Sequence, residues 1–213
     1  MLIDLHCHTR ALSGCSSLSP EELVGLAKQR GLNAVCFTEH DRTWSDLELT
    51  ALRSRLDFCL FRGVEVTTEL GHALVFGLDR FEPDMYFSAR LRDRVVAAGG
   101  FMVLAHPARG GQPSIGFAEC KMLFDAVEGL NGSDGPAQNA AAARLGAGMV
   151  LPPIAGSDCH SPREVASAAT RLRRPVSTER ELVAELRCGR HEIVDLRLPA
   201  NVIAAGERTD DAS

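Results

Sequence analysis

The stretch Leu2-Ile3-Asp4-Leu5-His6-Cys7-His8-Thr9 joins a short apolar strand to two histidines. Alternate side chains of a strand point to the same face, so His6 and His8 can reach a single atom at the end of this strand. A His-x-His pair is by itself weak evidence for a metal site, because many such pairs are ordinary surface residues. The interpretation therefore depends on the strands that follow.

Strand-like and helix-like segments alternate along the rest of the chain. Strands are predicted at residues 2–5, 34–37, 58–66, 73–76, 101–105, 126–130, 153–155 and 168–170, and helices at 20–30, 45–55, 84–98, 116–124, 136–146 and 178–188. This alternation indicates an α/β fold of parallel strands, and the number of strands fits a closed or nearly closed barrel of about seven βα units. A doubly wound sheet is the alternative, but the sequence lacks the Gly-rich phosphate loop that usually follows its first strand.

The composition is that of an ordinary globular domain, with 45% hydrophobic and 24% charged residues among 213. We predict one domain over residues 1–198 and a flexible C-terminal segment over residues 199–213. The net charge of −5 argues against a protein that holds long nucleic acid by neutralising phosphates. The seven cysteines form no CxxC pair and no signal peptide is recognisable, so a reduced, cytoplasmic protein is expected. No apolar run is long enough to cross a membrane.

The later strands also carry residues of the types that bind metal ions at their edges. Six of the seven histidines lie at such edges, together with two carboxylates: His6, His8, His40, His72, His106 and His160, with Glu65 and Asp158. Each residue alone is more often structural, but the strand ends of a parallel barrel meet at one rim, where the set can act together. Imidazole and carboxylate suit zinc, manganese or iron, and the two oxygens of Glu65 suit a bridge between two ions.

The charge of such a site indicates its substrate. Two divalent ions held by Glu65, Asp158 and neutral imidazoles leave a net charge of about +2, which favours an anion. A metal-bound hydroxide forms near neutral pH, and paired ions hold both the attacking and the leaving oxygen, as the hydrolysis of a phosphate ester requires. Arg109 is the first candidate for contacting the phosphate, followed by Arg10 and Arg42.

The ordered motifs resemble the polymerase and histidinol phosphatase (PHP) domain family over about residues 2–170. They are Asp4–Thr9, Thr38-Glu39-His40-Asp41, Gly63-Val64-Glu65, His72, Ala105-His106-Pro107 and Gly156-Ser157-Asp158-Cys159-His160. The resemblance implies a distorted (β/α)7 barrel with two or three divalent metal ions at the C-terminal rim of the strands. It also implies a phosphoesterase that acts on a phosphomonoester or phosphodiester of a small metabolite, nucleotide or short oligonucleotide.

The resemblance further implies a ligand set for each ion. The first ion is expected on His6, His8, Glu65 and Asp158, the second on Glu65, His72 and His106, and the third on His40 and His160. Members of the family usually have an aspartate or histidine soon after the His-x-His pair, but the loop Thr9–Ser16 has neither. Cys15 could replace that ligand, although an ordinary loop thiol is the preferred interpretation. Without a third ion, His160 or His40 is expected to donate the proton to the leaving group.

Two other function classes remain open. Metal-dependent amidohydrolases also begin with a His-x-His pair, but they commonly bridge their metals with a carboxylated lysine, and Lys28 and Lys121 both fall in predicted helices. A non-catalytic scaffold or RNA-binding relative of the fold would not need the nearly complete set of ligands. Hydrolysis of a lactone or amide would favour the first alternative, and tight RNA binding without metal would favour the second.

Overall fold

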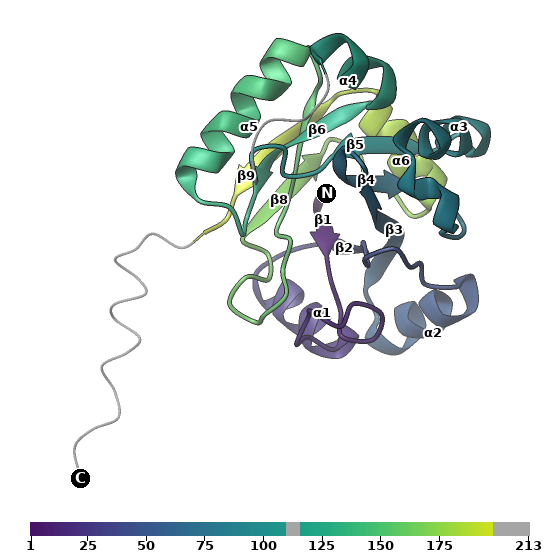
Figure 1. Ribbon diagram of the computed structural model, residues 1–213. Coiled ribbons are helices and arrows are strands. Elements are labelled where there is room, and N and C mark those ends of the chain that lie inside the picture. Colours follow the sequence, from purple (N-terminus) through teal and green to yellow (C-terminus); the bar gives the residue numbers. More distant parts are fainter. Residues whose placement is uncertain (110–115, 198–213) are drawn as a thin grey trace.

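The computed structural model describes residues 1–109 and 116–197, which form a strongly curved sheet surrounded by helices (Figure 1). Its nine strands are β1 (Leu2–Cys7), β2 (Ala34–Phe37), β3 (Cys59–Thr68), β4 (Gly71–Phe76), β5 (Phe101–Leu104), β6 (Ala126–Asn131), β7 (Pro153–Gly156), β8 (Ala168–Leu172) and β9 (His191–Asp195). The helices are α1 (Pro20–Gln29), α2 (Asp46–Leu56), the 3-10 turn η1 (Pro83–Tyr86), α3 (Ser88–Ala98), α4 (Phe117–Leu123), α5 (Pro136–Met149) and α6 (Glu179–Arg187). The segment 199–213, expected to be flexible, lies outside the described residues.

The strand order is β7-β6-β5-β4-β3-β2-β1-β8-β9. Strands β1 to β3 pair in parallel, as do β5 to β7, but β4 runs antiparallel to both of its neighbours. The turn between Thr68 and Gly71 is too short for the crossover that a parallel connection requires. The expected α/β class and barrel-like sheet are confirmed, while the expectation of uniformly parallel strands is wrong for β4 and β8.

The sheet curls until β7 approaches β1. Asp158 N donates to His6 O at 2.7 Å, and His8 N donates to Cys159 O at 3.3 Å. The contact requires Gly156, because a Cβ at this position would lie 2.4 Å from His6 Cβ and 2.7 Å from His6 N. This contact brings the ends of the first and seventh strands together.

The interior of the curved sheet holds an apolar cluster that includes Leu5, Phe61, Phe76 and Phe101. Helix α6 packs its buried face against the same cluster. Two further clusters lie where helices pack on the sheet, one including α1 and α2 and the other α3, α4 and α5. Apolar packing on both faces of the sheet therefore holds the strands that carry the histidines.

Several helix and strand boundaries differ from the expectation. The helix expected at 84–98 is divided at Phe87 into η1 and α3, because the carboxylate of Glu69 accepts hydrogen bonds from Ser88 N and Ser88 Oγ and so fixes a new helix start. Strand β9 was not predicted, because its side chains are half-buried or exposed and show no apolar alternation. The capping box at Ser19 and Glu22 is confirmed.

Among the described residues, the helices are too short or too polar to cross a membrane.

Candidate metal centre

The two histidines at the end of β1 face two carboxylates from other strands. His6 Nε2 lies 3.3 Å from Glu65 Oε2 and 3.5 Å from Asp158 Oδ1. His8 Nε2 lies 3.1 Å from the same Glu65 oxygen and 3.4 Å from the same Asp158 oxygen. All four side chains are buried, and their donor atoms lie within 4.8 Å of one another. The four residues expected on the first ion thus form one compact group.

Glu65, on β3, is the carboxylate around which the other histidines gather. Its Oε1 lies 2.7 Å from His72 Nδ1 and 2.9 Å from His106 Nε2, the two histidines expected on the second ion. Its Oε2 lies 3.0 Å from His40 Nδ1. Each oxygen of Glu65 therefore has its own set of imidazole neighbours, which is the arrangement that a bridge between two ions needs.

His40 and His160 flank His8 at the opening of the site. The centroids of both rings lie 4.4 Å from that of His8, and the side chains are 30% and 29% exposed, whereas His8 is fully buried. His160 Nδ1 donates to the backbone carbonyl of Asp158 at 2.9 Å, which leaves its Nε2 free. The donor atoms of His8, His40 and His160 lie within 4.8 Å of one another, so His8 joins the pair expected on a third ion.

Three buried donor atoms at the centre of this group lack hydrogen-bond partners among the described residues. They are His6 Nε2, His8 Nε2 and Glu65 Oε2. Buried polar atoms without partners cost free energy, and a divalent cation at this position would satisfy all three. Imidazole and carboxylate are donors that zinc, manganese and iron accept. The residues present therefore fit a divalent metal centre.

The residues of the site shift one another's pKa values. Burial lowers the pKa of His8, but its contacts with Asp158 and Glu65 raise it to about 9. Burial raises the pKa of Glu65, yet the charge of His6 and hydrogen bonds from the other imidazoles hold it well below its usual value. Burial and the neighbouring His8 lower the pKa of His160. A metal ion that bound to these imidazoles would have to displace their protons.

Two candidate ligands have unusual backbone conformations. His106 and Asp158 have positive φ angles of 26° and 54°, a region that side chains other than glycine rarely adopt. Hydrogen bonds hold both peptides, from His106 N to Glu128 Oε2 at 2.9 Å and from Asp158 N to His6 O at 2.7 Å. Backbone strain of this kind concentrates at functional sites, where surrounding contacts enforce it.

A buried glutamate outside the group of candidate ligands orients His8 through hydrogen bonds. Glu39 accepts hydrogen bonds from Thr9 N at 3.0 Å, Thr9 Oγ1 at 2.6 Å, Ser13 Oγ at 2.6 Å and Trp44 Nε1 at 2.9 Å. Ser13 Oγ also lies 3.4 Å from His8 Nδ1. Glu39 therefore fixes the loop after β1 and, through Ser13, keeps His8 Nε2 directed into the centre.

His6 has a corresponding partner on β6 that we did not predict. Its Nδ1 lies 2.8 Å from Glu128 Oε1, and Asn131 Nδ2 donates to both Glu128 Oε2 at 3.0 Å and Asp158 Oδ2 at 3.2 Å. The available signal was a single acidic residue inside the apolar strand expected at 126–130. A charged residue in such a strand needs a buried partner, and a histidine ligand is one.

Arg109 lies at the edge of the site and is bound to its carboxylates. Its Nε donates to Asp134 Oδ1 at 2.8 Å, while its two terminal nitrogens donate to Asp158 Oδ2 at 2.7 Å and to Asn131 Oδ1 at 3.1 Å. An arginine has five N–H groups, so two remain for another acceptor. The guanidinium thus holds Asp158 in place and keeps donors available for a substrate.

Two further arginines were predicted to contact the phosphate, and Cys15 was a candidate metal ligand. Arg10 donates to Ser17 O and Glu22 and is engaged away from the centre. Arg42 is exposed and has no ion pair within residues 1–109 and 116–197. Cys15 is exposed and belongs to none of the groups of donor atoms found in the described parts of the chain. The structure therefore does not group Cys15 with the histidines.

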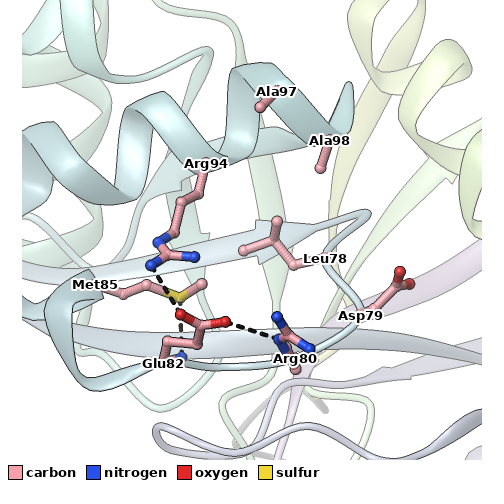
Figure 2. A pocket seen from close by; sticks show the side chains of 8 residues that line it. All are labelled: Leu78, Asp79, Arg80, Glu82, Met85, Arg94, Ala97 and Ala98. Atoms are coloured by element: carbon pink, nitrogen blue, oxygen red, sulfur yellow. Dashed lines mark hydrogen bonds and ion pairs between the residues drawn. The ribbon is translucent and has the colours of Figure 1, made fainter.

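A separate groove of about 420 Å³ lies between α3 and the segment that follows β4 (Figure 2). It is lined by Leu78, Asp79, Arg80, Glu82, Met85, Arg94, Ala97 and Ala98. Figure 2 shows Glu82 between two arginines, and its oxygens lie 2.8 Å from Arg80 Nε and 2.8 Å from Arg94 NH2. The charges in the groove thus neutralise one another, and none of the candidate metal ligands lines it.

Relatives with similar sequences share part of this chain. It is 34% identical over 85 residues to a protein of Chromobacterium violaceum named 3',5'-nucleoside bisphosphate phosphatase, a match that covers 38% of this chain and 29% of that protein. It is 33% identical over 86 residues to a 5'-3' exoribonuclease of Haemophilus influenzae, with coverage of 38% and 31%. The matched segment spans less than a third of the length of these curated relatives.

A solved structure shares the fold over nearly the whole chain. The crystal structure of PsfC from Pseudomonas syringae superposes with a TM-score of 0.69 and 19% identity, covering 96% of both chains.

The model of the PHP domain matches residues 4–95, and the model of the PHP-associated region matches residues 136–191. These two segments make up most of the chain and contain all of the candidate ligands except His106. This chain is a member of the PHP domain family.

Proposed function

We propose that this chain is a metal-dependent hydrolase of phosphate esters. The observation that carries the proposal is the convergence of His6 Nε2, His8 Nε2 and Glu65 Oε2, three buried atoms without hydrogen-bond partners among the described residues. Divalent ions, when bound, supply Lewis acidity to substrate oxygens and lower the pKa of water. Zinc, manganese and iron all suit these donors, and we propose two ions, with a third where its ligands suffice.

The proposed ligands fall into three overlapping sets. The first ion is held by His6, His8, Glu65 and Asp158, the second by Glu65, His72 and His106, and the third by His40 and His160 beside His8. Where the third ion is absent, His40 or His160 is free to give the leaving group its proton, since both rings reach the opening of the site. The buried ligands would then bind metal while the exposed ones contact the substrate.

The charge of this ligand set supports an anionic substrate. It contains two carboxylates and six imidazoles, so two divalent ions would leave a net charge of about +2. Arg109 has two N–H groups beyond those that bind Asp134, Asp158 and Asn131, and we propose that they contact a phosphoryl oxygen. Arg42 has no ion pair in the part of the chain that the structure describes and is the second candidate.

We propose a nucleotide or a short oligonucleotide as the substrate class. The names of the two curated relatives, a nucleoside bisphosphate phosphatase and an exoribonuclease, support a phosphate ester attached to a nucleoside. The net charge of −5 opposes binding of long nucleic acid, which is attracted mainly by positive charge. Small phosphorylated metabolites belong to the same class of ester, and p-nitrophenyl phosphate stands for such monoesters in the test.

The test measures metal content and turnover together. The purified protein is stripped with a chelator, reloaded with Zn²⁺ or Mn²⁺, and assayed with p-nitrophenyl phosphate, bis-p-nitrophenyl phosphate, a nucleoside 3',5'-bisphosphate and a short oligoribonucleotide. We expect metal-dependent release of phosphate or nucleotide by the wild type and none by Glu65→Gln, which keeps the shape of the side chain but removes its charge. Equal turnover by the two proteins would contradict the proposal.

Two further substrates address the alternative functions. Hydrolysis of a lactone or an amide, but of neither phosphate ester, would favour an amidohydrolase. Against that reading, Lys28 Nζ donates to Leu56 O on the surface, and Lys121 lies on α4, so neither described lysine bridges the centre. Tight RNA binding by metal-free protein without turnover would favour a non-catalytic role.

A further inference from the structure

The geometry points to Glu128 as the positioning residue of the metal centre, one that holds ligands from three strands without being a ligand itself. This inference rests on the proposed metal-dependent function. Glu128 lies in β6 and is fully buried, although its neighbours in the strand are apolar or glycine. A buried carboxylate persists only when its oxygens are well hydrogen-bonded, so its partners indicate what it does.

One oxygen of Glu128 sets the protonation pattern of His6. His6 Nδ1 lies 2.8 Å from Glu128 Oε1, and both side chains are fully buried. A carboxylate accepts hydrogen bonds, so the neutral imidazole carries its proton on Nδ1. The lone pair is then on Nε2, the atom that faces Glu65 and Asp158 and lacks a hydrogen-bond partner among the described residues. Glu128 thereby presents His6 to the ion in the tautomer that can bind it.

The other oxygen of Glu128 holds two further ligands. Oε2 accepts from His106 N at 2.9 Å and so anchors the backbone at the positive φ angle of 26° that aims His106 at Glu65. Oε2 also accepts from Asn131 Nδ2 at 3.0 Å, and the same amide group donates to Asp158 Oδ2 at 3.2 Å. Asp158 is thus held through its outer oxygen, while its Oδ1 faces the imidazoles.

The orientation of the Asn131 amide follows from its neighbours. Its Oδ1 accepts from Ser133 N at 2.9 Å and from Arg109 NH2 at 3.1 Å, so its amino group must point toward the two carboxylates. Ligands on β1, at the end of β5 and after β7 are therefore connected through Glu128 and Asn131. Because these segments lie far apart in sequence, their relative positions depend on such cross-links.

Only a carboxylate satisfies all three partners of Glu128. His6 Nδ1, His106 N and Asn131 Nδ2 are each donors, and a glutamine would turn its own N–H₂ group toward at least one of them. Glu128→Gln is therefore a sharp probe that preserves volume and shape. Loss of an outer hydrogen bond to a metal ligand typically weakens metal affinity by about 10- to 100-fold, and we expect a loss in this range.

The experiment measures Zn²⁺ affinity by chelator competition and the visible absorption of the Co²⁺-loaded protein. Wild type is compared with Glu128→Gln and with Glu185→Gln, a matched control whose glutamate is also buried but lies on α6 among other residues. We expect weaker Zn²⁺ binding and an altered Co²⁺ spectrum for Glu128→Gln only. Unchanged affinity and an unchanged spectrum in a folded Glu128→Gln protein would overturn the inference.

A second measurement needs no variant. In Zn²⁺-loaded wild type with ¹⁵N-labelled histidine, long-range proton–nitrogen spectra are expected to show His6 protonated at Nδ1 and metal-bound at Nε2. Binding through Nδ1 would contradict the assignment even if Glu128→Gln did not fold. Both readouts are independent of turnover: normal metal binding with no ester hydrolysis would refute the proposed function alone, whereas hydrolysis with a wrong His6 tautomer would refute this inference alone.

Discussion

His72 Nδ1 lies 2.7 Å from Glu65 Oε1, although His72 is near the start of β4 and Glu65 is within β3. The two strands form an antiparallel hairpin in which Thr67 pairs with His72 and Glu65 pairs with Leu74. Diagonal neighbours on one face of such a pair are within reach of each other's long side chains. The reversal of β4 therefore brings the beginning of this strand, rather than its end, to the candidate metal centre.

Replacing Glu65 by glutamine is expected to weaken both the metal centre and the metal-free fold. The buried carboxylate contacts imidazoles on both of its oxygens, and breaking a buried ion pair by removing one partner typically costs 3–5 kcal/mol. We expect the free energy of unfolding to fall by about 3 kcal/mol in chelator at pH 7. Urea unfolding followed by circular dichroism, together with metal analysis after dialysis, measures both effects. Wild-type metal content in this variant would contradict the assignment.

The stability of the metal-free protein is expected to fall as the pH rises from 6.5 to above 9. The pKa of His8 is raised from its ordinary value of 6.5 to about 9, so the protonated imidazole stabilises the fold below pH 6.5 and this contribution is lost through pH 9. The full shift corresponds to about 3 kcal/mol. Denaturant unfolding in chelator at pH 6.5, 8 and 9.5 measures the change.

Saturating Zn²⁺ provides the control for this pH dependence. The ion requires neutral imidazole, so its affinity rises over the same interval while the metal-free fold weakens. His8→Gln should flatten the profile of the metal-free protein. A metal-free wild type whose stability increases between pH 6.5 and 9.5 would disprove the proposed role of His8.

Gly156→Ala is expected to loosen the contact between β7 and β1. The added Cβ would lie 2.4 Å from His6 Cβ and 2.7 Å from His6 N, so the two strands must separate. Overpacking of this kind typically costs 1–3 kcal/mol, and we expect about 3 kcal/mol because backbone lies in the way. Gly25→Ala in α1 is the matched control: its Cβ would meet no atom within 4 Å, and we expect about 1 kcal/mol of stabilisation. Chemical denaturation that ranked the two variants in the opposite order would refute this account.

Arg109→Lys is expected to lower both metal affinity and turnover. The guanidinium reaches Asp134, Asp158 and Asn131 from three different nitrogens, which a single ammonium cannot do. We expect a loss of about tenfold in Zn²⁺ affinity, with an additional rise in KM for a phosphate ester. Arg90→Lys, on the exposed side of α3, is the control. If only KM changes, Arg109 serves the substrate and does not hold Asp158.

Much of the candidate site follows from the sequence because its proposed ligands lie next to apolar strands. His6, His106 and Asp158 each lie within or directly after a strand whose composition is clear, and parallel strands must present such ends together. The direction of β4 could not be predicted in this way, since an apolar strand has the same composition in either direction. Only the short turn before Gly71 carries that information.

The residues that hold the candidate ligands and the helix starts in place were harder to predict, because their partners are distant in sequence. Glu128 lies 122 positions after His6, and no spacing rule connects one acid in an apolar strand with a histidine on another. The start of α3 at Ser88 has the same origin, since it depends on hydrogen bonds that Ser88 donates to Glu69 across 19 positions. Local propensity reveals elements and candidate ligands, while long-range polar contacts decide how they are held.

The contact of β7 with β1 also orders events during synthesis. The ligand set proposed for the first ion combines His6 and His8 from the opening strand with Asp158 from a segment more than 140 residues later. A nascent chain that has released its first five strands from the ribosome still lacks this carboxylate, so it offers the ion only part of its coordination. The set proposed for the first ion is therefore complete only after the seventh strand, in chains whose sheet has closed, whereas the second set is already complete once His106 has been made.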